Sequence, residues 1–265
     1  MNKPRVKLLR YRLITSKNYF YSNPPPLEIP KNSEFHGELK NGILTVYPIK
    51  DYPSKDGAEI VAKDFLEAWE IFVGIEKGLG IIEFIFDSVE MEDLNASNKA
   101  LSLSGTTSIS FSCSANLLGV LNKYPSPPEF FQVNDTVRLL WLRYKNFKDG
   151  KELLLGMGYY CLSKVLNDVE NDVEVKKTRD KIKAAGLKYR IANAVLRELS
   201  NITSRYGDGQ SARKYTRDST NAPLTANEEK WVEETIKMLI KRIAQFPLGA
   251  PETIALITMG DLPSI

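Results

Sequence analysis

The hydrophobic pattern of the chain changes at a proline-rich segment near its middle. Before this segment, apolar and polar residues alternate in several short runs, as they do in β-strands, and after it apolar residues recur every three or four positions, as they do in helices. The three prolines within Tyr124–Pro128 can continue neither a helix nor a central strand. We therefore predict an α+β protein with a sheet domain over residues 1–123, a linker over 124–133 and a helical domain over 134–265.

The first domain is predicted to contain an antiparallel or mixed sheet with one packed helix. Strand-like runs cover residues 6–14, 35–39, 43–49, 81–86 and 100–113. Asn41-Gly42 lies between two alternating runs and is a strong signal for a hairpin turn. Apolar residues at helical spacing predict a helix over 56–77, and Gly78 is expected to end it in the left-handed conformation.

The second domain is predicted to be a helical bundle. Asn134 or Asp135 can begin a helix that reaches Phe147, and a second helix follows Gly150 and extends through Val165. Asn171 with Glu174, and Thr225 with Glu228, have the spacing of capping boxes. A further helical pattern runs over 187–202, and Pro247 ends the helix that begins near Thr225.

Residues for several kinds of chemistry are scarce in the sequence. His36 is the single histidine, so sites that need two imidazoles cannot be built within one chain. Gly150-Lys151 is followed by Glu152 rather than Ser or Thr, and neither G-x-S-x-G nor G-x-G-x-x-G occurs. We predict no catalytic residues, no metal site and no cofactor.

Composition also guides the expected location. The two cysteines, Cys113 and Cys161, are far apart, which favours a reducing compartment over a disulfide framework. The cations near the N-terminus are spread among apolar residues, unlike those of a signal peptide, and no apolar run is long enough to span a bilayer. We expect a cytoplasmic protein that does not enter the membrane.

Positive charge is concentrated in one stretch of the helical domain. Residues 176–217 contain 12 Lys or Arg against 3 Asp or Glu. In the helical pattern over 187–202, an apolar face is expected to pack inward; it consists of Leu187, Ile191, Val195, Leu199 and Ile202. The opposite face carries Arg190, Asn193 and Arg197, which can donate hydrogen bonds to phosphates or carboxylates. The alternative is a solvated helix face, paired with the acidic residues that flank the stretch on both sides.

The same stretch resembles a known family. Leu196–Asn201, Arg205–Gly209 and Ala212–Tyr215, within a bundle of several helices, look like the helical domains of the HEPN superfamily. Members of that family are often RNA-cleaving or RNA-binding modules of prokaryotic defence and toxin systems, and active members carry an R-x4-6-H motif. No histidine follows Arg197 or Arg205 at that spacing, so the resemblance implies a non-catalytic member whose Arg197 and Arg205 serve binding.

The sequence of the sheet domain also shows a resemblance. Pro24-Pro25-Pro26, the hairpin and Ala68-Trp69-Glu70 on the predicted helix resemble uncharacterised bacterial proteins, and this resemblance implies no activity.

Other candidate groups have simpler interpretations. The alternating acids over 168–174 lack the glycine and the final glutamate of a calcium loop, so a solvated turn is expected there. Cys161 lies among small residues of a predicted helix and is expected to pack rather than react. The aromatic run Tyr19–Tyr21 is expected to form a small cluster under a loop rather than a platform for bases.

The sequence therefore favours a non-catalytic binding or interaction module that contacts RNA or another polyanion. The predicted contact residues are Arg190, Asn193, Arg197, Arg205, Arg213 and Lys214. One alternative is a ribonuclease or Mg²⁺-dependent hydrolase that works without histidine and uses carboxylates such as Glu90, Glu92 and Asp93. Another is a structural protein that forms a homo-oligomer, in which the acidic flanks cover the basic helices.

Overall fold

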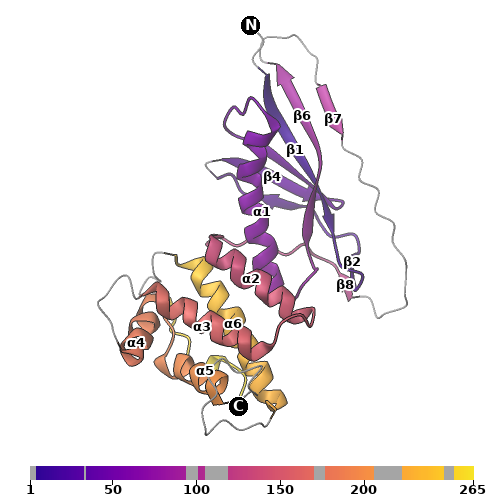
Figure 1. The fold of residues 1–265 in the computed structure, drawn as a ribbon. Helices are drawn as coiled ribbons and strands as arrows, with labels where there is room; N and C mark the ends of the chain where they lie inside the picture. Colours follow the sequence, from indigo (N-terminus) through magenta and orange to yellow (C-terminus); the bar gives the residue numbers. More distant parts are fainter. Residues whose placement is uncertain are drawn as a thin grey trace. The chain divides into compact units, whose positions relative to one another are not determined.

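The computed structural model describes residues 4–32, 34–93, 101–104, 119–169, 177–205, 223–247 and 254–265. The chain forms two compact units, Met1–Glu129 and Phe130–Ile265, which we call the sheet unit and the helical unit. Strands and one long helix make up the first unit, and helices make up most of the second (Figure 1). The predicted α+β class is therefore confirmed.

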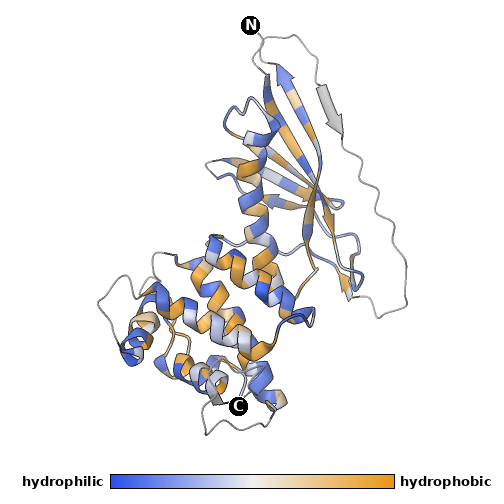
Figure 2. Cartoon of the chain, in the orientation of Figure 1, coloured by the Kyte–Doolittle hydropathy of each residue, from blue (hydrophilic) through white to orange (hydrophobic). Residues whose placement is uncertain are grey.

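The sheet unit is built on an antiparallel sheet of six strands. In the order β3-β4-β5-β1-β6-β7, these are Leu27–Ile29, Phe35–Lys40, Ile43–Pro48, Pro4–Ile14, Glu83–Asp93 and Leu101–Ser104. A separate parallel pair joins β2 (Tyr19–Tyr21) to β8 (Gly119–Leu121). Hydrophilic and hydrophobic bands follow one another along β1, as expected for a strand with one buried face (Figure 2). Of the strand predicted over 100–113, residues 101–104 form β7, and 105–113 lie outside the described part of the chain.

Two local signals in this unit have the predicted effect, and one does not. Asn41 and Gly42 both have positive φ angles, 51° and 73°, and join β4 to β5 as a tight hairpin turn. The helix α1 runs over Lys55–Lys77, and the Ser54 side chain accepts a hydrogen bond from the Gly57 amide. Gly78 ends this helix at φ 110° and ψ 162°, so the left-handed stop predicted for Gly78 is wrong although its φ is positive.

One face of the sheet and α1 together enclose the core of this unit. Trp69 of α1 is fully buried, and its Nε1 donates a hydrogen bond of 3.0 Å to the Pro125 carbonyl. Tyr124 is also buried, and its hydroxyl accepts a hydrogen bond of 2.9 Å from the Gly42 amide. Tyr124 and Pro125 therefore belong to the sheet unit, so the linker begins later than the predicted residue 124.

The helical unit contains five helices and a short 3₁₀ turn in its described residues. They are α2 (Asp135–Lys148), α3 (Leu154–Asp168), α4 (Thr178–Tyr189), α5 (Asn193–Arg205), α6 (Ala226–Gln245) and η1 (Met259–Asp261). Asn134 caps α2 by accepting a hydrogen bond from the Val137 amide, and the predicted capping box of Thr225 and Glu228 begins α6. The other predicted capping box, Asn171 with Glu174, lies outside the described residues.

The helix predicted over 187–202 is interrupted. Arg190 has a left-handed φ of 54° and forms the C-cap of α4, and α5 begins only at Asn193. Ile191, Val195, Leu199 and Ile202 are buried as predicted, but Leu187 is 68% exposed, so its predicted inward position is wrong. The physical reason is a contact distant in sequence: Ile191 forms a parallel β-bridge with Ile257, and this bridge requires extended backbone between the two helices.

Candidate functional site

Arg190, the first residue of the predicted basic face, binds the C-terminal segment of its own chain. Its Nε donates a hydrogen bond of 3.1 Å to the Ile254 carbonyl, and its own carbonyl accepts one of 2.9 Å from the Ile257 amide. Arg242 of α6 is only 8% exposed and donates 2.9 Å to the neighbouring Ala255 carbonyl. Burial, together with the positive charge of Arg190, lowers the pKa of Arg242. Arg190 thus helps to hold residues 254–257 in place.

The other predicted contact residues have different surroundings. Asn193 is half-buried, and its Oδ1 lies within 2.5 Å of where a Cβ on Gly186 would stand, so it packs against the end of α4. Arg197 is exposed on α5. Arg205 is the last residue of α5, and its side chain lies outside the described part, as do Arg213 and Lys214. Of the three predicted residues whose side chains are described, Arg190 ends α4 while Asn193 and Arg197 lie on α5, so these three do not share one helix.

A different set of exposed cations occupies α4, its N-cap and α5. Residues 177–205 contain 8 Lys or Arg and 2 Asp or Glu. Within the described part of the chain, four of these cations are exposed and have no carboxylate within 4 Å; we call them the open cations, and they are Lys177, Arg179, Lys183 and Arg197. Arg179 and Lys183 are four residues apart and so share one face of α4. The neighbouring helices α4 and α5 therefore present positive charge that the described residues do not neutralise.

Four acids of the flanking segments, all within the described residues, bind groups other than the open cations, whereas Glu170, Asp172 and Glu174 lie outside the described part of the chain. Asp168 pairs with Lys188 at 2.9 Å and accepts a short hydrogen bond from Tyr189. Glu228 accepts hydrogen bonds from both the amide and the hydroxyl of Thr225. Two of the other acids that follow the basic stretch bind other groups: Glu233 pairs with Lys148 and Tyr144, and Glu234 pairs with Lys237. These acids therefore do not cover the open cations.

The cations of β1 provide the opposite case. Arg5 pairs with Glu92 and Asp51, Lys7 and Arg10 pair with Glu90, and Arg12 pairs with Asp87. The hydrogen bond from Lys7 is the main cause of a lowered pKa at Glu90. Glu90 and Glu92, candidate Mg²⁺ ligands in the enzyme alternative, are thus engaged by arginine and lysine. In the described ranges, no three or more His, Cys, Asp or Glu side chains are grouped to hold a metal ion.

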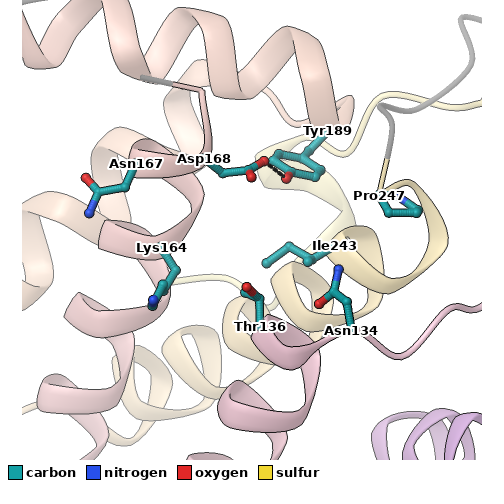
Figure 3. A pocket seen from close by; sticks show the side chains of 8 residues that line it. All are labelled: Asn134, Thr136, Lys164, Asn167, Asp168, Tyr189, Ile243 and Pro247. Carbon is teal, nitrogen blue, oxygen red and sulfur yellow. Dashed lines mark hydrogen bonds between the residues drawn. The ribbon is translucent and has the colours of Figure 1, made fainter. Parts of the chain in front are cut away.

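A cavity of about 220 Å³ with both polar and apolar lining lies among the helices of the helical unit, and Asn134, Asn167 and Asp168 of its lining are exposed to solvent (Figure 3). It is lined by Asn134, Thr136, Lys164, Asn167, Asp168, Tyr189, Ile243 and Pro247. Asp168 and Tyr189 meet on one side of the cavity, and Lys164 and Thr136 lie on the other. No sequence pattern reveals this cavity, because four helices contribute to it; the one local signal is the four-residue spacing of Lys164 and Asp168 on α3.

Asp168 is the charged acceptor of this cavity. Partial burial favours a higher pKa, but hydrogen bonds from Tyr189 and Lys188 outweigh it and hold the Asp168 pKa below its ordinary value. Both donors bind Oδ2, and Oδ1 has no hydrogen-bond partner among the described residues. The carboxylate therefore stays ionised at neutral pH and retains one oxygen for a further donor.

Cys161 and His36 lie apart from these sites. Cys161 is fully buried in α3, and burial raises its thiol pKa to about 12, so the nucleophilic thiolate does not form at neutral pH. His36 is exposed on β4, where its ring stacks on Tyr47 with 5.0 Å between the ring centres.

Comparison of the chain with protein-family models, with curated proteins and with solved structures finds no match. None of the helices in the described residues is both long and apolar enough to cross a lipid bilayer.

Proposed function

We propose that the helical unit binds a polyanion, with RNA as the first candidate, through its open cations. The observation that carries this proposal is the contrast between two groups of cations on the same chain. Those of β1 are matched by acids at 2.5–3.5 Å, whereas Lys177, Arg179, Lys183 and Arg197 have no such match in the described chain. Exposed clusters of lysine and arginine are the electrostatic signature of phosphate contact.

Arg205, Arg213 and Lys214 follow the open cations in sequence and extend the proposed contact region. Arg190 and Asn193 are also predicted contact residues. In the structure Arg190 binds the Ile254 carbonyl and Asn193 packs against the end of α4, so the proposal does not depend on them. An RNA-binding role agrees with what the HEPN resemblance implies, and that resemblance stays a prediction.

The test is binding of labelled single-stranded RNA to the full chain across a salt series. Four phosphate contacts predict a slope of about −3 in a plot of log K against log salt, because each contact to a single strand contributes roughly −0.7. A variant with K177Q, R179Q, K183Q and R197Q should lose most of that slope and bind more weakly at low salt.

The matched control removes the same charge from the sheet unit. Lys17, Lys31, Lys40 and Lys63 are exposed, have no acid within 4 Å in the described chain, and are scattered over loops, a strand end and α1. Replacing these four by Gln should leave the salt slope unchanged. Equal losses in both variants, or no RNA binding at about 50 mM salt, would overturn the proposal.

The same experiment tests the enzyme alternative when it is run with Mg²⁺ and with chelator. Cleavage of the RNA that requires Mg²⁺ would contradict the non-catalytic part of the proposal.

A further inference from the structure

We propose that the cavity of the helical unit lined by Lys164, Thr136 and Asp168 binds a small carboxylic acid that also carries an amino or hydroxyl group. Its carboxylate would lie beside Lys164 and Thr136, and its donor group would reach Asp168. This site is separate from the open cations and does not depend on the proposed RNA binding.

Lys164 is the cation of the lining, and the acid of the lining is engaged by another cation. Asp168 pairs with Lys188, which lies outside the lining, at 2.9 Å. Lys164 Nζ lies 5.7 Å from the centre of the Tyr160 ring, and no described carboxylate is within 4 Å of it. A ligand with one carboxylate would give Lys164 an ion-pair partner.

The N-terminus of α2 favours an anion on the same side of the cavity. Asn134 is its N-cap and Thr136 belongs to its first turn, where the helix dipole is positive. The Asn134 Oδ1 is used by the Val137 amide, so its Nδ2 is the group left to donate to a ligand. The Thr136 hydroxyl has no hydrogen-bond partner among the described residues and adds a second donor.

The opposite side of the cavity accepts hydrogen bonds. Asp168 is held ionised, and its Oδ1 has no partner in the described chain. An ammonium or hydroxyl group of the ligand is the complement of this oxygen, and a bare anion such as phosphate or acetate lacks the donor. Ile243, buried in α6, gives an apolar surface for a short carbon chain between the two polar groups.

The first experiment titrates the full chain with the standard L-amino acids, with lactate and malate, and with acetate and inorganic phosphate as anions without the donor. Binding is followed by calorimetry and by amide chemical shifts. At least one amino or hydroxy acid should bind at millimolar concentration or below, and more tightly than acetate and phosphate.

Two variants then assign the contacts. Lys164→Met and Asp168→Asn should each weaken binding by about tenfold or more, since a hydrogen bond to a charged group contributes on that scale. Lys230→Met is the matched control, because Lys230 is exposed on α6 and is not part of the cavity lining, and it should bind like the wild type.

If Asp168→Asn perturbs the fold, analogues of the ligand test the contact with Asp168 on the wild-type protein. An analogue without the amino or hydroxyl group should bind the wild type more weakly, and Asp168→Asn should weaken that analogue no further. Absence of binding at about 10 mM ligand would overturn the proposal. So would acetate or phosphate binding as tightly as the amino and hydroxy acids, or an unchanged affinity in Lys164→Met.

Discussion

Strand β1 and helix α4 both carry closely spaced cations, but they differ in what faces them. Antiparallel pairing sets residues of β6 directly opposite β1, and the register that aligns Arg5 with Glu92 places an acid beside an arginine. On α4, the surface neighbour of Arg179 four residues on is Lys183, and that of Lys183 is Leu187. A sheet thus supplies partners from distant sequence, whereas an exposed helix face has only its own neighbours.

The most direct test of this difference is to remove the acids that pair with the cations of β1. Asp87→Asn and Glu90→Gln would remove the acids that pair with Lys7, Arg10 and Arg12, and Glu92→Gln would remove one of the two acids that pair with Arg5. If unmatched cations are what binds RNA, this variant should bind about tenfold more tightly at low salt and show a steeper salt slope. Filter binding across a salt series measures both quantities.

The control for this variant makes the same change in net charge without uncovering a cation. Glu28, Glu38 and Glu83 have no ion pair within 4 Å in the described chain, and replacing all three by Gln should increase the affinity much less. An equal gain in both variants would mean that net charge, rather than local pairing, governs binding.

Several acids among the described residues of the helical unit stabilise its structure, and the capping box of α6 is one example. Thr225→Ala removes the hydroxyl that accepts from the Glu228 amide, and it should lower the free energy of unfolding by about 1 kcal/mol. Urea denaturation measures this cost. RNA affinity should not change, and a change would indicate that Glu228 acts on the open cations after all.

Glu233 allows a similar test by pH. Burial favours a higher pKa, but hydrogen bonds from Lys148 and Tyr144 outweigh it and keep the Glu233 pKa below its ordinary value. A pKa that is lower in the folded state contributes stability above the unfolded pKa, about 4.3, and loses it as the pH falls through the folded value.

Glu233→Gln should therefore flatten the acid side of the stability profile by at most about 1 kcal/mol, since the ion pair is partly exposed to solvent. Chemical denaturation at a series of pH values measures this difference. A variant whose stability falls as steeply as that of the wild type below about pH 5 would contradict the assignment.

The sequence predicted local features well and distant contacts poorly. The Asn41-Gly42 turn, the Asn134 cap and the capping box that begins at Thr225 each depend on residues within a few positions, and each is present in the structure. The break at Arg190 depends on Ile257, which no pattern near Arg190 contains, so the sequence suggested one helix where two exist.

For the candidate sites too, local features could be predicted from the sequence and contacts distant in sequence could not. A count of charges located the basic stretch, but it could not show that Arg190 binds the Ile254 carbonyl or that Asp168 is taken by Lys188. The cavity escaped prediction because Thr136, Lys164 and Tyr189 are brought together only by helix packing.

The smallest expected effect is on the free energy of unfolding, and it tests whether the open cations contribute to stability or only to binding. Arg179→Gln with Lys183→Gln should change the free energy of unfolding by no more than about 0.5 kcal/mol, because exposed side chains without partners contribute little to stability. The mutual repulsion of two like charges four residues apart on one helix face is also removed, so a slight gain in stability is the expected direction. Thermal and urea unfolding of the double variant measure it. A loss of more than about 1 kcal/mol would mean that these cations already have partners within the folded chain, and the contrast with β1 would then no longer hold.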